Sequence, residues 1–158
     1  FTHGIAEAFG ASARVARAIA IGLALTLTSG LFALAHGAQN FPFRKEVSDL
    51  DVPLEDGTGD GEYLTLLETH LPTALNGHHP DFVFYLAGAD PYEGDRLGRL
   101  KLTIGGLHQR DELVIGACRR AGLPLAISMS GGYAADIDAI VTIHANTIRS
   151  AVRYSIRA

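Results

Sequence analysis

Residues 84–100 read FYLAGADPYEGDRLGRL, and the fold is decided where this apolar run becomes polar. The run over 82–86 has the length and the continuous apolar character of a buried strand. A glycine-flanked loop follows, with Asp90 and then Asp95 beside Arg96. In sheets of parallel strands, functional residues lie just beyond the carboxyl ends of the strands. Asp90 is therefore a candidate metal ligand, although a carboxylate after a strand also commonly caps a turn.

The segment after this loop predicts a helix. Leu107, Val114 and Cys118 recur at helical spacing, and Gly122 and Pro124 are typical stop signals after a helix. Cys118 is expected in the core on this helix face.

A second strand and a last helix follow. The apolar run over 123–129 ends at Tyr133, after Gly131 and Gly132. The last helix carries an apolar face that is expected to be covered: Ile137, Ile140, Val141, His144, Ile148 and Val152. Strand, helix, strand and helix in this order predict an α/β fold with a parallel sheet flanked by helices, in which the strands over 82–86 and 123–128 run parallel in one sheet.

The upstream half is less regular. Alternating apolar residues over 50–54 predict a half-buried strand, and Asp60 is a plausible N-cap for a helix that Pro72 kinks or restarts. Residues 31–35 predict a short buried strand, and the alanine-rich residues 5–28 predict a helix.

The composition bounds the class of protein. A chain of 158 residues that is 47% hydrophobic and 19% charged has the size and character of one globular domain. A net charge of −4 gives no attraction to nucleic acid, so no nucleic-acid partner is expected. The single cysteine, Cys118, cannot form an internal disulfide, so we expect a cytoplasmic protein.

Residues 18–35, AIAIGLALTLTSGLFALA, carry no charge and reach the lower length limit of a membrane span. Residues 33–35 also imitate a signal-peptidase site. Glycine, threonine and serine dilute the segment, so we prefer a buried helix that runs into a core strand. A membrane-tethered domain with residues 18–35 as its anchor is the alternative.

If the two strands are neighbours, the Asp90 carboxylate and the Tyr133 phenol converge over one crevice. His36 follows the predicted strand over 31–35, and it either lines this crevice or has a structural role in its loop. Other residues that could suggest a site are interpreted as structural: the exposed pair His78-His79, the calcium-like turn over 56–61, Glu68 with His70, and the core residue His144.

Four stretches are specific in combination, although each alone is weak. They are LFALAHGAQNFPFRKEVSDLDVPLEDGTGDGEYL (31–64), FYLAGADPYEGDRLGRLKLT (84–103), RDELV (110–114) and SGGY (130–133). In this order they resemble the C-terminal half of the histone deacetylase and acetylpolyamine amidohydrolase family, closest to its class IV branch. The resemblance implies an arginase/deacetylase-like fold and a zinc enzyme. Its substrate would be a small acetylated amine or an acetyl-lysine peptide, whose N-acetyl amide it hydrolyses.

The resemblance also assigns roles to individual residues. Asp90 matches a zinc-binding aspartate, and Tyr133 matches the tyrosine that hydrogen-bonds the substrate carbonyl and its oxyanion. Gly131 and Gly132 match the glycines that let the acyl chain pass close to the backbone. Leu97 matches the leucine at the narrow part of the acyl tunnel. Asp95 and Arg96 are expected to form an ion pair that shapes the tunnel rim.

Two motifs of the family do not occur in the sequence. Its other zinc ligands come as Asp-x-His, which is found nowhere in the chain, and its paired catalytic histidines lie still further upstream in the family. We therefore expect residues 31–158 to be the C-terminal part of a deacetylase-like domain, apparently incomplete on its N-terminal side. Residues 1–30 would be a divergent helical segment.

A catalytic zinc needs about three protein ligands. The isolated chain is therefore expected to bind zinc weakly and to hydrolyse acetyl-lysine negligibly. The alternative is a non-catalytic remnant of the family that acts as a binding or structural domain.

Overall fold

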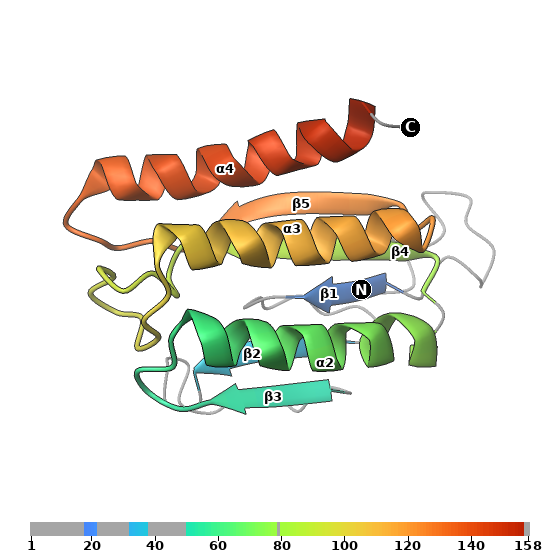
Figure 1. Ribbon diagram of the computed structural model, residues 1–158, viewed down its shortest axis with the longest axis horizontal. Coiled ribbons are helices and arrows are strands. Elements are labelled where there is room, and N and C mark those ends of the chain that lie inside the picture. Colours follow the sequence, from blue (N-terminus) through green and yellow to red (C-terminus); the bar gives the residue numbers. More distant parts are fainter. Residues whose placement is uncertain (1–17, 22–31, 38–49, 79, 157–158) are drawn as a thin grey trace, which may run out of the picture.

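The computed structural model describes residues 18–21, 32–37, 50–78 and 80–156, which form a parallel sheet with helices (Figure 1). The strands are β1 (Ala18–Ile21), β2 (Phe32–Gly37), β3 (Leu50–Leu54), β4 (Phe82–Gly88) and β5 (Leu125–Ser130). The helices are α2 (Asp60–His78), α3 (Ile104–Arg120) and α4 (Ile137–Ile156). The predicted α/β class is confirmed.

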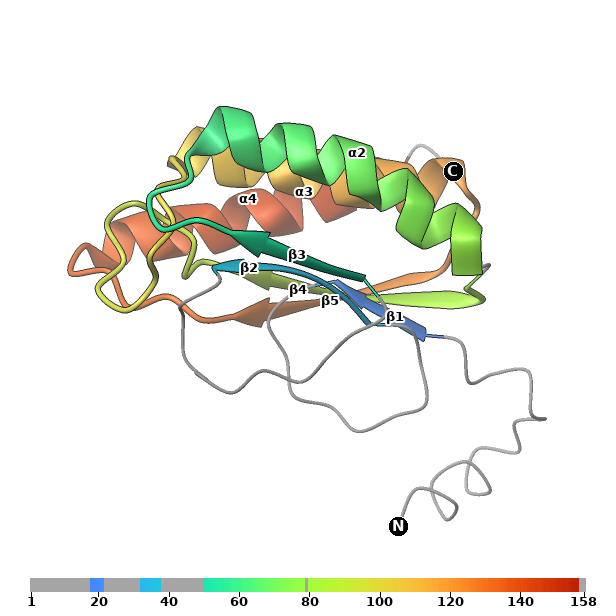
Figure 2. The same ribbon diagram turned by 90° about the horizontal axis from the view of Figure 1, so that it is seen from below.

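The sheet has the strand order β3-β2-β1-β4-β5, and each pair of neighbours is parallel. The predicted parallel direction of the two downstream strands is confirmed. They are also direct neighbours, with a register from Val83 opposite Leu125 to Gly88 opposite Ser130. The three helices lie side by side over one face of the sheet (Figure 2). The carboxyl ends of the strands point to the same end of the molecule, at the left of Figure 1.

The predicted helix over 5–28 is wrong at Ala18–Ile21, which forms β1 between β2 and β4. A short apolar run with two isoleucines suits a strand, and its periodicity does not distinguish it from a helix. The rest of that range lies outside the described residues, as do the side chains of β2. The part of residues 18–35 that the structure describes is strand, and no helix among the described residues is both long and apolar enough to cross a membrane.

The core lies between the sheet and the helices. Val83, Tyr85 and Ala87 alternate along β4 and point into this layer, whereas Phe84 between them is half exposed on the other face. On α3, the predicted face with Leu107, Val114 and Cys118 is fully buried. Burial raises the pKa of the Cys118 thiol to about 11.

The two ends of α3 follow the predicted signals. At its start, the Thr103 hydroxyl accepts a hydrogen bond of 3.0 Å from the backbone N–H of Gly106. At its end, Gly122 has a φ of +69°, and its N–H donates to the Arg119 carbonyl.

Asp60 begins α2 as predicted, but its carboxylate does not cap that helix. It accepts hydrogen bonds from the backbone N–H (2.8 Å) and the hydroxyl (2.6 Å) of Thr103. Asp60 therefore ties the start of α2 to the start of α3. The helix also does not restart at Pro72. Helix α2 continues through this residue, whose side chain is exposed.

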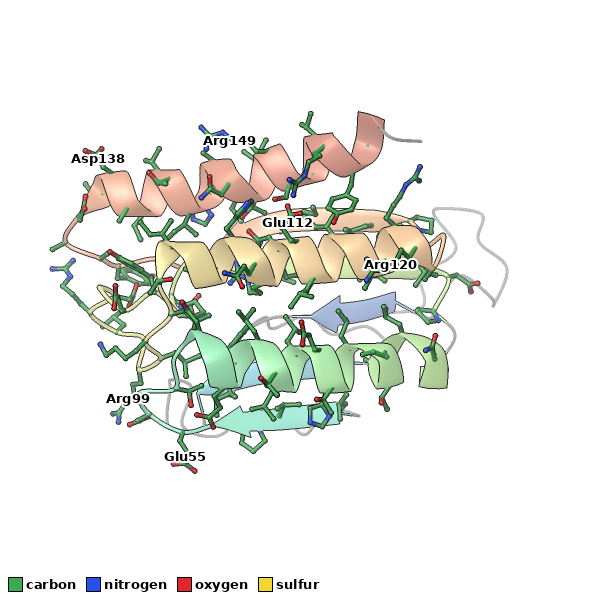
Figure 3. The ribbon with its side chains drawn as sticks, viewed as in Figure 1. Glu55, Arg99, Glu112, Arg120, Asp138 and Arg149 are labelled. Atoms are coloured by element: carbon green, nitrogen blue, oxygen red, sulfur yellow. The ribbon has the colours of Figure 1, made fainter. Side chains whose placement is uncertain are left out.

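The predicted apolar face of α4 is only partly covered. Four of its residues are exposed: Ile137 (71%), Val141 (59%), Ile148 (55%) and Val152 (50%). The residues buried against α3 are instead Ala139, Ile143, Thr147 and Ser150. The physical reason is a hydrogen bond from the Thr147 hydroxyl to the buried carboxylate of Asp111 on α3. An ion pair between Glu112 and Arg153 adds to the contact. Figure 3 shows Glu112 between the two helices.

Candidate functional site

The candidate site is at the carboxyl ends of β4 and β5, which end side by side. The Ala89 N–H donates a hydrogen bond of 2.9 Å to the Ser130 carbonyl, one step beyond the last register pair. The loop over 89–99 and the turn over 131–133 consequently meet. The loop that carries Asp90 and the turn that carries Tyr133 therefore lie against each other.

Asp90 lies in a cradle of glycines. A side chain added at Gly88 or at Gly131 would collide with the Asp90 carboxylate, and one added at Gly98 would collide with its carbonyl oxygen. Burial raises the pKa of the Asp90 carboxyl, while the charge of nearby Arg110 acts in the opposite direction. The carboxylate is therefore partly desolvated, and a bound cation would favour its ionised form.

Gly131 and Gly132 have φ values of +61° and +116°, in the region that favours glycine. The second glycine also faces Ala89 and Ile140, which leave little room for a side chain. These glycines let the chain turn closely around Asp90 before Tyr133.

Tyr133 and Leu97 are exposed around this cradle, by 54% and 66%. The predicted ion pair between Asp95 and Arg96 is wrong. The Asp95 carboxylate accepts backbone N–H groups, including that of Tyr133 at 2.5 Å, and Arg96 donates to the Tyr133 carbonyl at 2.8 Å. Both side chains bind the backbone of Tyr133 because its turn lies against their loop.

A buried charged network supports β4 beneath the site. Arg110 donates to the Gly88 carbonyl (2.7 Å) and twice to one carboxylate oxygen of Asp111 (3.0 and 2.8 Å). The Tyr85 hydroxyl donates to the same oxygen at 2.5 Å, and the Thr147 hydroxyl donates to the other oxygen at 2.5 Å. Burial raises the pKa of Tyr85 well above its usual value. Arg110 thus holds the end of β4, two residues before Asp90.

The described residues supply part of what a zinc ion requires. Asp90 fits as one ligand, because a desolvated carboxylate suits a cation. No group of three or more histidine, cysteine, aspartate or glutamate side chains among the described residues is arranged to hold a metal ion. His36 lies near the end of β2, at the same end of the sheet, but its side chain is outside the described part of the chain.

The described residues interpreted as structural lie in helices α2 and α4 and in the turn over 56–61, which contacts the loop over 89–99. His78 ends α2, at the opposite end of β4, and His79 is outside the described residues. The residues over 56–61 form a turn and the start of α2, and Asp56 pairs with Arg99 at 2.8 Å. His144 is half buried, as expected.

Arg110 and Asp111 support the site but were not predicted to do so from the sequence. A signal was present, because the two residues share the helix face of Leu107, Val114 and Cys118. Adjacent opposite charges on an otherwise apolar helix face indicate a buried pair.

Comparisons with known proteins identify the family. The model of the histone deacetylase domain matches residues 31–148, and the chain therefore belongs to this family. It is 45% identical over 116 residues to an uncharacterized protein of Picosynechococcus sp., covering 73% of this chain and 39% of that protein. It is 40% identical over 85 residues to histone deacetylase 2 of Arabidopsis thaliana, covering 54% of this chain and 22% of that protein.

The fold is that of solved deacetylases. An acetylpolyamine aminohydrolase from Burkholderia pseudomallei superposes with a TM-score of 0.71 at 18% identity, over 92% of this chain and 47% of the solved one. The predicted arginase/deacetylase-like fold is confirmed. The chain spans less than half the length of each of these relatives.

Proposed function

We propose that the domain containing this chain is a zinc-dependent deacetylase, which hydrolyses the N-acetyl amide of acetyl-lysine or of an acetylpolyamine. The observation that carries the proposal is the contact between the Asp90 carboxylate and the glycine turn that leads to Tyr133. Membership of the histone deacetylase family supports the reaction class. The similarity to a protein named acetylpolyamine aminohydrolase supports a small acetylated amine as substrate.

Tyr133 would stabilise the oxyanion. Attack of water on the amide carbonyl moves negative charge onto the carbonyl oxygen, and a phenolic O–H aimed at that oxygen is a preorganised donor. The exposed side chain of Leu97 would line the narrow part of the acyl tunnel. Gly131 and Gly132 would let the acyl chain pass close to the backbone, since they carry no side chain.

Asp90 would be one zinc ligand. When bound, zinc polarises the carbonyl and lowers the pKa of its water to about 7. Because Asp90 is one of about three ligands that such an ion needs, the proposal requires ligands and proton-transfer groups beyond the described residues. For the isolated chain we accordingly propose weak zinc binding and negligible turnover.

We also propose a cytoplasmic location and no nucleic-acid partner, on the basis of the charge and the single cysteine.

The test compares the isolated 158-residue chain with the whole gene product that contains it. Zinc content is measured by elemental analysis, and acetate release is measured with an acetyl-lysine peptide and with an N-acetylated diamine. We expect zinc and turnover in the whole product alone. Asp90→Asn should remove the zinc, whereas Tyr133→Phe should keep it and lower kcat about 10²–10³-fold.

Asp81→Asn is the matched control, since Asp81 is exposed at the opposite end of β4. A whole gene product without zinc and without turnover would favour a non-catalytic binding role. Turnover by the isolated chain that Asp90→Asn abolishes would show that the chain holds a complete site.

A further inference from the structure

Two consecutive residues of the loop after β4 hold Tyr133 through both of its backbone polar groups. Asp95 accepts the Tyr133 N–H at 2.5 Å, and the Arg96 Nε donates to the Tyr133 carbonyl at 2.8 Å. These contacts join segments 38 and 37 residues apart in the sequence.

The Asp95 carboxylate also shapes its own loop. One oxygen accepts the N–H groups of Leu97 (2.8 Å) and Gly98 (2.7 Å), and the other oxygen accepts that of Tyr133. Asp95 is buried, and both oxygens of its carboxylate have backbone N–H donors. Hydrogen bonds to a charged acceptor are about twice as strong as neutral ones.

The same loop packs directly on Asp90. Gly98, which donates to Asp95, lies so close to the Asp90 carbonyl oxygen that a side chain there would collide with it. One carboxylate therefore fixes both the loop against Asp90 and the backbone of Tyr133.

Tyr133 needs such support because two glycines precede it. Gly131 and Gly132 have left-handed φ values and restrict the backbone less than other residues would. The position of the Tyr133 ring relative to Asp90 then depends on contacts made from outside the turn.

We propose that Asp95 and Arg96 are positioning residues. They form a clamp that holds the backbone of Tyr133 in a fixed position relative to Asp90. The role in catalysis rests on the proposed deacetylase function, whereas the clamp itself is a property of the folded chain. Since a displacement of about 1 Å at a reacting group can cost about 100-fold in rate, loss of the clamp should lower kcat more than it changes KM.

The clamp is tested first by hydrogen exchange of single amides in the 158-residue chain. Asp95→Asn replaces one accepting oxygen with a donating NH₂ group, and it should speed exchange of the Tyr133 amide about tenfold relative to a distant strand. Asp136→Asn is the matched control. Asp136 also accepts two backbone N–H groups, those of Asp138 and Ala139, but at the start of α4.

The catalytic consequence is tested in the whole gene product. Asp95→Asn should lower kcat about 10–100-fold while KM changes less than about threefold. Arg96→Ala should lower kcat by about three- to tenfold without a change in melting temperature, because Arg96 is exposed, and Arg96→Lys should recover part of the loss. Arg99→Gln is its control, since Arg99 pairs with Asp56 and not with Tyr133.

Unchanged exchange of the Tyr133 amide in Asp95→Asn would overturn the clamp. An unchanged kcat of both variants in an active wild type would overturn its role in positioning Tyr133 for catalysis. If Asp95→Asn fails to fold, exchange and kcat of Arg96→Ala decide the question. A wild-type gene product without activity would instead contradict the proposed function, and the exchange result would still decide whether the clamp exists.

Discussion

The two faces of α4 reverse the usual relation between polarity and burial. The face against α3 buries Thr147 and Ser150 together with Ile143, while the face turned away exposes Ile137 and Ile148. The outward direction is visible in Figure 3, where Asp138 and Arg149 point away from α3.

The difference shows that a partner, and not apolar content, decides which face of this helix is buried. Asp111 of α3 is fully buried, and one oxygen of its carboxylate accepts a hydrogen bond from the Thr147 hydroxyl. Burying a carboxylate without hydrogen-bond donors costs free energy. The face of α4 that carries Thr147 is therefore turned toward Asp111. If this comparison is right, substitutions on the inner face should cost far more than matched ones on the outer face.

The largest effect is expected at the centre of the inner face. Asp111→Asn leaves the buried Arg110 cation without its counterion, which should lower the free energy of unfolding by about 3–5 kcal/mol in urea titrations. Glu68→Gln is the control, because Glu68 is exposed on α2, and it should change stability by less than about 0.5 kcal/mol. Similar values for the two variants would mean that the network does not hold α3 and α4 together.

The elements that could be predicted are those whose pattern of apolar residues fits a single type of secondary structure. The strands β4 and β5 and the helix α3 followed from short apolar runs and from the spacing of Leu107, Val114 and Cys118. For β1, four apolar residues suit a buried strand and a buried helix equally, so only the pairing with β2 and β4 distinguishes them. The face of α4 was misread because its buried side is set by one hydrogen bond to another helix.

The second prediction compares two isoleucines of α4. Ile143→Ala should cost roughly 3 kcal/mol, because the deleted side chain is fully buried and leaves a cavity. Ile148→Ala, on the exposed face, should cost less than about 0.5 kcal/mol apart from its small effect on helix propensity. Equal losses in thermal or urea unfolding would show that the outer face is covered in solution.

The site divides in the same way between what the sequence predicts and what it does not. The convergence of the Asp90 loop with the Tyr133 turn follows from two parallel strands that end side by side. The contacts of Asp95 and Arg96 do not, since they depend on where backbone N–H and C=O groups point in two loops. Residue type and spacing do not indicate where these backbone groups point. An adjacent acid and base therefore suggested an ion pair.

The third prediction isolates the hydroxyl of Thr147. Thr147→Val keeps the shape of the side chain and removes one donor to Asp111, which should cost about 1–2 kcal/mol of unfolding free energy. Thr142→Val is the matched change on the exposed side of the same helix and should be close to neutral. A neutral Thr147→Val would leave packing, and not the hydrogen bond, as the reason for the direction of α4.

The smallest expected effect is a pH dependence that originates at Tyr85. Burial raises the pKa of this phenol well above the value of about 10 in an unfolded chain, so the folded protein keeps a proton that the unfolded chain releases. The corresponding stability is fully present below about pH 10 and is lost as the pH rises toward the folded pKa, with a slope of up to about 1.4 kcal/mol per pH unit.

Tyr85→Phe should therefore flatten the decline of unfolding free energy between about pH 10 and 11, although it lowers stability at neutral pH by removing a donor to Asp111. A slope that Tyr85→Phe does not change would place the alkaline sensitivity outside this buried network.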